Sequence, residues 1–210
     1  MKNTFNIWLT FFAGFYETIF DSRVAYDPQM DIERYKDNFD VDITEDDIIF
    51  HEKEYEQAVA NRFWVEMENV LKEMGIVKRF VSGAEIVSPQ YYNYETDKIF
   101  CDAELVDDWQ DKMRDFIAAN WNRLQEDIAQ DFACGGGFFP FISNDLDVWV
   151  NMLFNENDLQ DRYISCLLHY FLKYDENFDV EHIEYNVIEA VCADEYAEIK
   201  LNEEQQKKLQ

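Results

Sequence analysis

The chain has 210 residues, of which 45 are Asp or Glu and 18 are Lys or Arg, so its formal net charge at pH 7 is −27. Because 17% of its residues are aromatic, it is not a disordered acidic tail, which would lack the apolar surface that folding buries. The charge excludes direct binding to nucleic acid or to an anionic membrane, since both are bound through Lys and Arg. We therefore expect one folded acidic domain over residues 1–210, whose partner is a basic surface.

The first half of the chain predicts a small antiparallel sheet and one long helix. Residues 5–13 are rich in β-favouring side chains and predict a strand. Apolar residues that recur at intervals of three and four predict a helix over 45–74, with Thr44 as its N-cap. Strands are expected over 77–87 and 99–105, and they are expected to pair antiparallel.

The second half of the chain is rich in predicted helices. The clearest amphipathic pattern covers 107–132. Further helices are expected at 144–154, 159–173 and 180–192, followed by a strand at 196–201. Together these elements predict an α+β fold in which several amphipathic helices pack a small antiparallel sheet. Residues 138–194 could form a helical subdomain within it.

The same spacing identifies the side chains that should be buried. Five large apolar residues of the two long helices are expected in the core: Phe63, Met67, Trp109, Phe116 and Leu124. The cysteines form no C-x-x-C pair and are interpreted as free, buried thiols in a reducing cytosol: Cys101, Cys134, Cys166 and Cys192. No apolar run reaches the roughly 20 residues that cross a bilayer, so we expect a cytoplasmic protein without a membrane partner.

Motifs for metal binding and catalysis are missing from the sequence. The acidic segments that start at Asp40 and Asp175 have neither the Gly at position six nor the Glu at position twelve of a calcium loop. The histidines are isolated from one another, at His51, His169 and His182, and no common hydrolase or zinc motif is present. We therefore expect no enzymatic activity, no metal and no cofactor. A site made of carboxylates alone stays open, because spacing cannot discriminate among so many acids.

Acidic residues are densest in two segments, over 31–56 and 175–204. Duplex DNA carries about one negative charge per 1.7 Å, so a net charge of 27 corresponds to roughly 46 Å of duplex. A rigid fold that holds such an array can imitate DNA without losing ordering entropy on binding. The candidate partner-binding acids are Asp40, Asp42, Glu45, Asp46 and Asp47 in the first segment and Asp175, Glu176, Asp179, Glu181 and Glu184 in the second.

A tyrosine-rich loop over 88–97 supports an alternative function. Its recognition side chains would be Tyr91, Tyr92, Asn93 and Tyr94, since tyrosine offers contact area and a hydrogen-bonding tip at low entropic cost. The chain would then be a non-catalytic interaction or assembly protein, although the same tyrosines could simply cover the sheet. Charge geometry separates the hypotheses, because mimicry requires carboxylates in a continuous row on one face, whereas acidity for solubility spreads them over every face.

Two motifs carry a resemblance to a known family. The segments GFYET at 14–18 and SPQYYNYETDKI at 88–99 resemble uncharacterised proteins encoded by phages and mobile elements, which show a G-F-Y-E-S-like strand and an S-P-x-x-Y-N-F-x-T-D-x-I signature. Where that family has a His after the first motif, this chain has Phe20-Asp21. The resemblance implies no activity, but it implies a genomic setting in which counter-defence proteins are common.

These observations lead to one functional hypothesis. We expect an inhibitor from a phage or mobile element that acts as a DNA mimic in the cytoplasm of the bacterial host. It would block the basic nucleic-acid-binding groove of a host defence protein of the restriction or CRISPR type. The sequence does not fix the oligomeric state, and a homodimer is left open.

Overall fold

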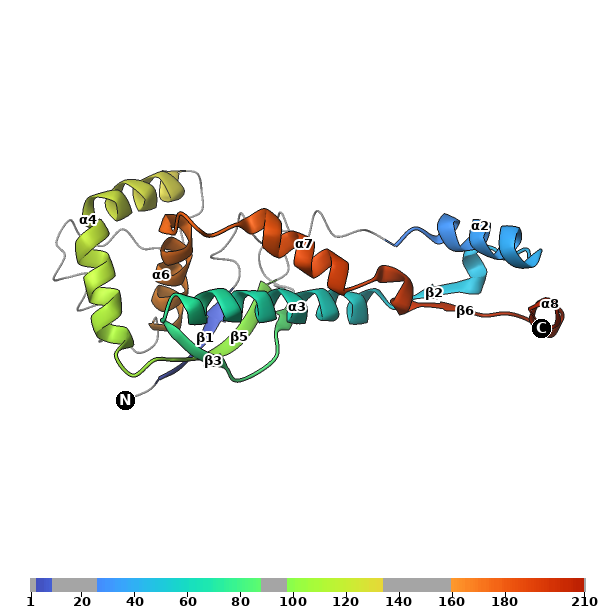
Figure 1. Cartoon of the computed structure of the whole chain (residues 1–210), viewed down its shortest axis with the longest axis horizontal. Helices are drawn as coiled ribbons and strands as arrows, with labels where there is room; N and C mark the ends of the chain where they lie inside the picture. Colours follow the sequence, from blue (N-terminus) through green and yellow to red (C-terminus); the bar gives the residue numbers. More distant parts are fainter. Residues whose placement is uncertain (1–2, 9–25, 88–97, 134–159, 210) are drawn as a thin grey trace.

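The computed structural model describes residues 3–8, 26–87, 98–133 and 160–209. Within these ranges, helices and antiparallel strands form the expected α+β fold. The molecule is elongated, with a thick body at one end and a thin arm at the other (Figure 1). We call residues 26–50 and 193–209 the arm, and the other described residues the body.

A sheet organised around one central strand lies in the body. It contains β5 (Lys98–Leu105) at its centre and, antiparallel to it, β1 (Thr4–Trp8) on one side and β3 (Val77–Phe80) and β4 (Glu85–Val87) on the other. The strand predicted over 77–87 is therefore two strands. Between them the Ser82 hydroxyl, in place of a backbone carbonyl, accepts from the Asp102 N–H at 3.0 Å. Residues 9–13 of the first predicted strand lie outside the described ranges.

Four helices pack around this sheet, and three of them match the predicted ranges closely. They are α3 (Glu52–Glu73), α4 (Trp109–Ala133), α6 (Gln160–Tyr174) and α7 (Val180–Ala190). Helix α3 packs on β3 and β4, α6 packs on β1, and α7 packs along α3. Gly75 follows the end of α3 with a φ of 74°, a conformation that glycine adopts without steric cost. The helix expected at 144–154 is not among the described residues.

The start of α3 corrects the sequence prediction, because the helix begins at Glu52 and not at residue 45. Thr44 does act as a cap, but it closes the short 3-10 turn Glu45–Asp47, in which the Asp47 carboxylate accepts from the Thr44 N–H at 2.9 Å. The chain then forms β2 (Ile48–Phe50), which pairs antiparallel with β6 (Ala197–Ile199). Helical spacing alone could not reveal this strand, since its partner lies far along the chain.

The core confirms the predicted buried residues. Phe63, Met67, Trp109 and Leu124 are at most 1% exposed, while Phe116 is half-buried and stacks on Phe171 with 3.8 Å between ring centroids. Cys101 and Cys166 are buried free thiols as expected, whereas Cys192 is free but exposed, which corrects the prediction for it. Cys134 lies outside the described residues. Burial raises the pKa of the Cys101 thiol to about 12. Across the described ranges, no helix combines the length and the apolar character that crossing a membrane demands.

The arm contains a helix that the sequence analysis did not predict, α2 (Pro28–Phe39). Asp27 caps it by accepting from the Gln29 N–H at 3.0 Å, and Pro28 occupies its first turn, as is common at helix N-termini. Asp31 is 3% exposed and accepts from the Tyr26 hydroxyl at 2.6 Å and from Arg34. Burial and this hydrogen bond raise the pKa of the Tyr26 hydroxyl.

A second unpredicted helix, α8 (Glu203–Lys208), fastens the end of the arm. Asn202 caps it by accepting from two backbone N–H groups. The Lys208 ammonium donates to the Asp40 carbonyl at 2.6 Å, and the Gln205 amide donates to the Asp42 carbonyl at 2.7 Å. The residues after 201 therefore hold the loop that follows α2.

Candidate functional site

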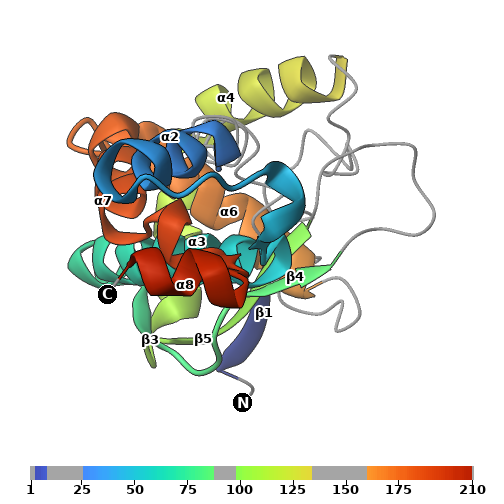
Figure 2. The same ribbon diagram turned by 90° about the vertical axis from the view of Figure 1, so that its right-hand side faces the viewer.

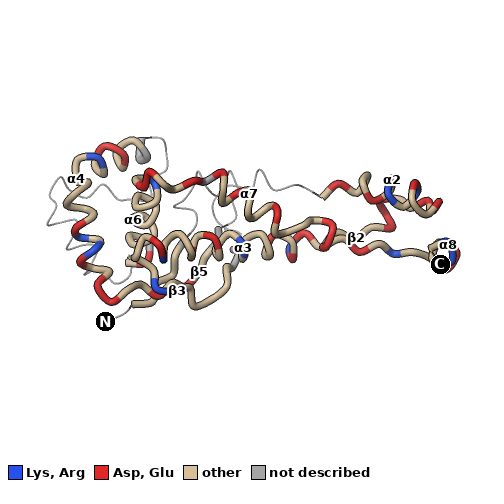
Figure 3. The backbone as a smooth tube through the Cα atoms, in the orientation of Figure 1, with Lys and Arg blue, Asp and Glu red and all other residues tan. Residues whose placement is uncertain are grey.

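The longest stretch without Lys or Arg among the described residues is rich in carboxylates. Residues 175–199 contain nine acids and no Lys or Arg, and they form the α6–α7 loop, α7, the 3-10 turn Ala193–Tyr196 and β6. We call these residues the acidic flank. Seven of the nine carboxylates are exposed, whereas Asp175 and Glu184 are half-buried. Figure 3 shows these acids running from the body into the arm.

Helix α7 supports the flank rigidly. Its Ile183 and Val187 are 4% and 1% exposed and belong to the core, and the helix packs along α3. Because residues four apart share a helix face, Glu181, Tyr185 and Glu189 form a row on the opposite, solvent-exposed side. The Tyr185 hydroxyl donates to the Glu189 carboxylate, which raises the pKa of that hydroxyl.

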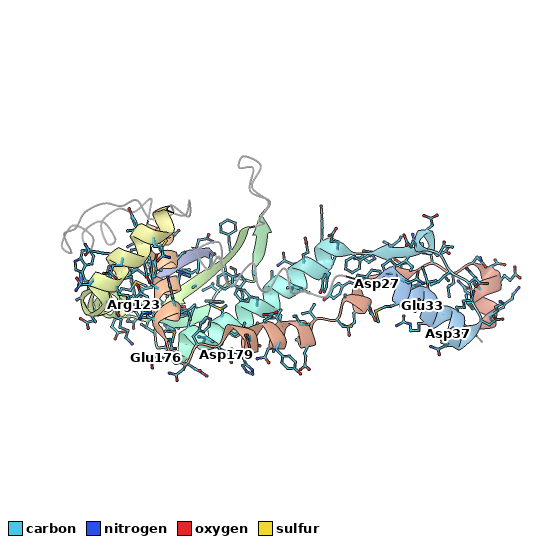
Figure 4. The ribbon with its side chains drawn as sticks, turned by 90° about the horizontal axis from the view of Figure 1, so that it is seen from above. Asp27, Glu33, Asp37, Arg123, Glu176 and Asp179 are labelled. Atoms are coloured by element: carbon cyan, nitrogen blue, oxygen red, sulfur yellow. The ribbon has the colours of Figure 1, made fainter. Side chains whose placement is uncertain are left out.

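The structure brings the second predicted group of acids together at the body end of the flank. Asp175, Glu176, Asp179, Glu181 and Glu184 lie on the α6–α7 loop and the first turns of α7, and Figure 4 shows Glu176 and Asp179 along the same edge of the molecule. Two of them also shape the backbone. Asp175 accepts from the N–H two residues on at 3.0 Å, and Asp179 caps α7 by accepting from the N–H three residues on at 3.2 Å.

The first predicted group lies in the arm, and three of its five carboxylates make contacts within the arm. The Asp42 carboxylate accepts from the Lys36 ammonium at 3.0 Å, and this hydrogen bond and the attraction between the charges lower the pKa of Asp42. Asp40 lies 3.7 Å from Lys208, and Asp47 closes the turn described above. Glu45 and Asp46 are exposed, and neither has an ion pair within the described residues.

Sequence reasoning missed the acids that connect the two groups. Along the flank they are Glu189, Asp194, Glu195 and Glu198, and on α2 they are Glu33 and Asp37. Helix α2 follows α7 along the long axis in Figure 1, and Figure 2, seen along that axis, shows both helices on the same side of the molecule. Arg34 of α2 lies 3.8 Å from Asp194 of the 3-10 turn that follows α7. The absence of Lys and Arg over 175–199 was a signal visible in the sequence.

Several cations of the body pair with acids outside the flank. Lys78 and Arg79 both pair with Glu104, at 2.9 and 2.6 Å, and lower its pKa. Lys173, which precedes the flank, lies 3.1 Å from Asp127 of α4, and Arg123 of α4 lies over the Tyr174 ring at 3.8 Å. Figure 4 shows Arg123 on α4 at the body end of the molecule. The negative charge is thus partly compensated in the body and largely uncompensated along the flank.

Metal and tyrosine sites receive no support from the described chain. No three His, Cys, Asp or Glu side chains in the described ranges are grouped so that they could hold a metal ion. The histidines stand apart, with His51 before α3, His169 in α6 and His182 in α7. The other predicted recognition residues, Tyr91, Tyr92, Asn93 and Tyr94, lie outside the described residues.

Comparison with known proteins adds no relative. No family model matches the chain, and no curated protein or solved structure matches it significantly. The motif at 14–18 and all but the last two residues of the motif at 88–99 lie outside the described ranges. The function is therefore argued from the charge, the shape and the contacts of the flank.

Proposed function

We propose that the protein is a DNA mimic, a phage or mobile-element counter-defence protein that blocks the nucleic-acid-binding groove of a host defence protein. The observation that supports this most directly is the acidic flank, in which nine carboxylates follow one another without a Lys or Arg among them. Acidity that serves solubility alone would not need a long stretch without compensating cations that is built around a packed helix.

The combined length of α7, in the flank, and α2, which lies outside it and also carries Arg34 and Lys36, suits a groove built for DNA. An α-helix rises 1.5 Å per residue, so α7 with 11 residues and α2 with 12 are about 16 and 18 Å long. Placed in line, they span about 34 Å, which is comparable to ten base pairs at 3.4 Å per phosphate along one strand. The elongated shape in Figure 1 lets this length be presented along one side.

Rigidity is what makes such an array useful. Carboxylates on a packed helix keep their spacing when they leave water, so little entropy is lost on binding. Long-range attraction then speeds the encounter with a basic groove, and the shape of the flank selects among basic partners. Because Asp40, Asp42 and Asp47 serve contacts within the arm, the body end of the flank is the stronger candidate for the interface.

The test begins with a pull-down from bacterial host lysate at low and at 1 M salt, followed by identification of the proteins that elute. A captured protein is then titrated with labelled duplex DNA and with this protein as competitor. Affinity should fall steeply with salt, because the Debye length shrinks from about 10 Å at 0.1 M to about 3 Å at 1 M.

A matched pair of variants locates the interface. The flank variant changes three exposed acids, Glu176→Lys, Glu181→Lys and Glu189→Lys. The control changes three exposed acids of α4 by the same charge, Asp111→Lys, Asp115→Lys and Glu126→Lys. We expect the flank variant to weaken competition with DNA by about a hundredfold and the control by less than about fivefold. Equal losses would show that only net charge matters and would contradict the proposal.

The tyrosine hypothesis gives the opposite pattern. Binding that ignores salt and both sets of reversals, but is lost when Tyr91, Tyr92 and Tyr94 are changed to Ala, would reject mimicry. The protein would then be an interaction or assembly protein that acts through residues 88–97.

A further inference from the structure

A pocket lies at the body end of the acidic flank, between the last turns of α3 and the start of α7. Its volume is about 420 Å³. It is lined by Val70, Glu73, Met74, Asp175, Asn177, Phe178, Asp179, His182 and Ile183. The pocket thus joins two predicted partner-binding acids to a helix that the sequence analysis did not connect with them.

The apolar part of the lining belongs to the edge of the core. Ile183 is buried, and Val70, Met74 and Phe178 are half-buried and pack against the core. These side chains are therefore held in place, and they offer an apolar wall and an aromatic ring next to solvent. A small hydrophilic ion would gain nothing from such a wall, whereas a side chain with an apolar stem would.

The charged part of the lining has one sign. Glu73, Asp175 and Asp179 contribute three carboxylates, and no Lys or Arg lines the pocket. Asp175 and Asp179 each use Oδ1 for the backbone hydrogen bonds of their turn. Glu73 is exposed and has no ion pair within the described residues. The positive end of the α7 dipole lies beside the pocket, and the Asp179 carboxylate, which accepts from one N–H there, offsets part of its repulsion of a cation.

We propose that this pocket receives an arginine side chain of the partner protein and anchors the complex. A guanidinium can lie against the Phe178 ring while its planar fork donates to carboxylates, and its three-carbon stem can pack on Val70 and Met74. A lysine ammonium has no planar group to stack and is more strongly hydrated. Deeply seated arginines often carry much of the binding energy of an interface. That this arginine belongs to a host defence protein rests on the proposed function.

The experiment uses the full chain and a defined probe, Nα-acetyl-arginine-N-methylamide, followed through backbone amide signals in ¹H–¹⁵N NMR spectra. We expect saturable shifts confined to residues 70–75 and 175–183, with affinity in the millimolar range. The citrulline analogue, which is uncharged but has the same shape, should cause no saturable shift, and the lysine analogue should bind at least threefold more weakly. Shifts of equal size at acids throughout the molecule would overturn the proposal.

A variant that preserves the fold tests the carboxylates. The changes Glu73→Gln, Asp175→Asn and Asp179→Asn remove three charges, and Asn retains the oxygen that the turn and the α7 cap require. We expect the probe to bind at least tenfold more weakly. The control, Asp111→Asn, Asp115→Asn and Glu126→Gln, removes the same charge from α4 and should change the affinity less than twofold. Equal losses in both variants would overturn the arginine site.

The ring is tested separately by Phe178→Leu, which keeps an apolar side chain and should weaken the arginine probe about threefold without affecting the lysine analogue. The outcomes separate this inference from the proposed function. If the probe saturates the pocket but the protein does not compete with DNA, the pocket is an arginine site and mimicry is wrong. If the protein competes with DNA but the probe does not bind, mimicry holds without this anchor.

Discussion

The body and the arm hold their carboxylates by different means. In the body, α7 is fixed by apolar side chains such as Ile183 and Val187 that are buried against the core. In the arm, the buried apolar side chains among the described residues are few, and polar contacts take a large share: Lys36 with Asp42, Lys208 with Asp40, and Asp31 with Tyr26 and Arg34. A scaffold built on apolar burial tolerates salt and acid, whereas one built on ion pairs responds to both.

The largest expected effect is a loss of stability of the body. Phe63 is fully buried in α3, so Phe63→Ala should lower the free energy of unfolding by about 3–5 kcal/mol through lost burial and a residual cavity. Chemical denaturation measures this loss. Val65→Ala, at a 46% exposed position of the same helix, is the control and should cost less than about 0.5 kcal/mol. A loss below 1 kcal/mol for Phe63→Ala would show that this side chain is not part of a packed core.

The second effect is confined to the arm. The Asp31 carboxylate is only 3% exposed and accepts from the Tyr26 hydroxyl and from Arg34. Asp31→Asn removes its negative charge. We expect the free energy of local opening of α2 to fall by about 1.5–3 kcal/mol. Amide hydrogen exchange should show faster exchange in α2 and unchanged exchange in β5.

The matched control for this prediction is Asp37→Asn, an exposed position on the same helix, which should leave the exchange of α2 nearly unchanged. If exchange in β5 accelerated together with exchange in α2, the body and the arm would be one cooperative unit and the comparison between them would fail.

The smallest effect concerns a single ion pair of the arm. The hydrogen bond and charge of Lys36 lower the pKa of Asp42, so the pair contributes stability above the ordinary carboxyl pKa and loses it as pH falls through the lowered value. Lys36→Met should therefore raise the pKa of Asp42 toward the ordinary value of about 3.9. A pH titration followed through side-chain carboxyl NMR signals measures the change, and Lys53→Met on α3 is the control. An unchanged titration in Lys36→Met would mean that the pair does not persist in solution.

The spacing of apolar residues predicted those helices and strands whose buried face is visible within their own sequence. Helices α4, α6 and α7 and the strand β5 were found from hydrophobic spacing, because each buries one face within its own length. Strand β2 was mistaken for the start of α3, since the pairing of Ile48 with Ile199 is not a local property. No element is predicted over helix α2, although Asp27-Pro28 is a typical helix start.

The candidate site was predictable in its density of acids but not in the use of each one. No sequence pattern separates Asp42, which pairs with Lys36, from Asp46, which has no ion pair within the described residues. The pocket beside Phe178 depends on the packing of α7 along α3, so Glu73 could not be associated with Asp175 from the sequence. The ion pairing of Asp42 and the packing of α7 along α3 both depend on tertiary structure, and they decide which charges face a partner.

The pairing of β2 with β6 also sets an order of events during synthesis. Residues 26–50 leave the ribosome early, but their strand partner at 197–199 is made only after the whole body. The sheet and helices of the body can therefore form while β2 of the arm still lacks its pairing strand, β6. A chain that ends before residue 197 could form the core of the body but not the β2–β6 pair. A folded arm therefore requires that translation has passed residue 197.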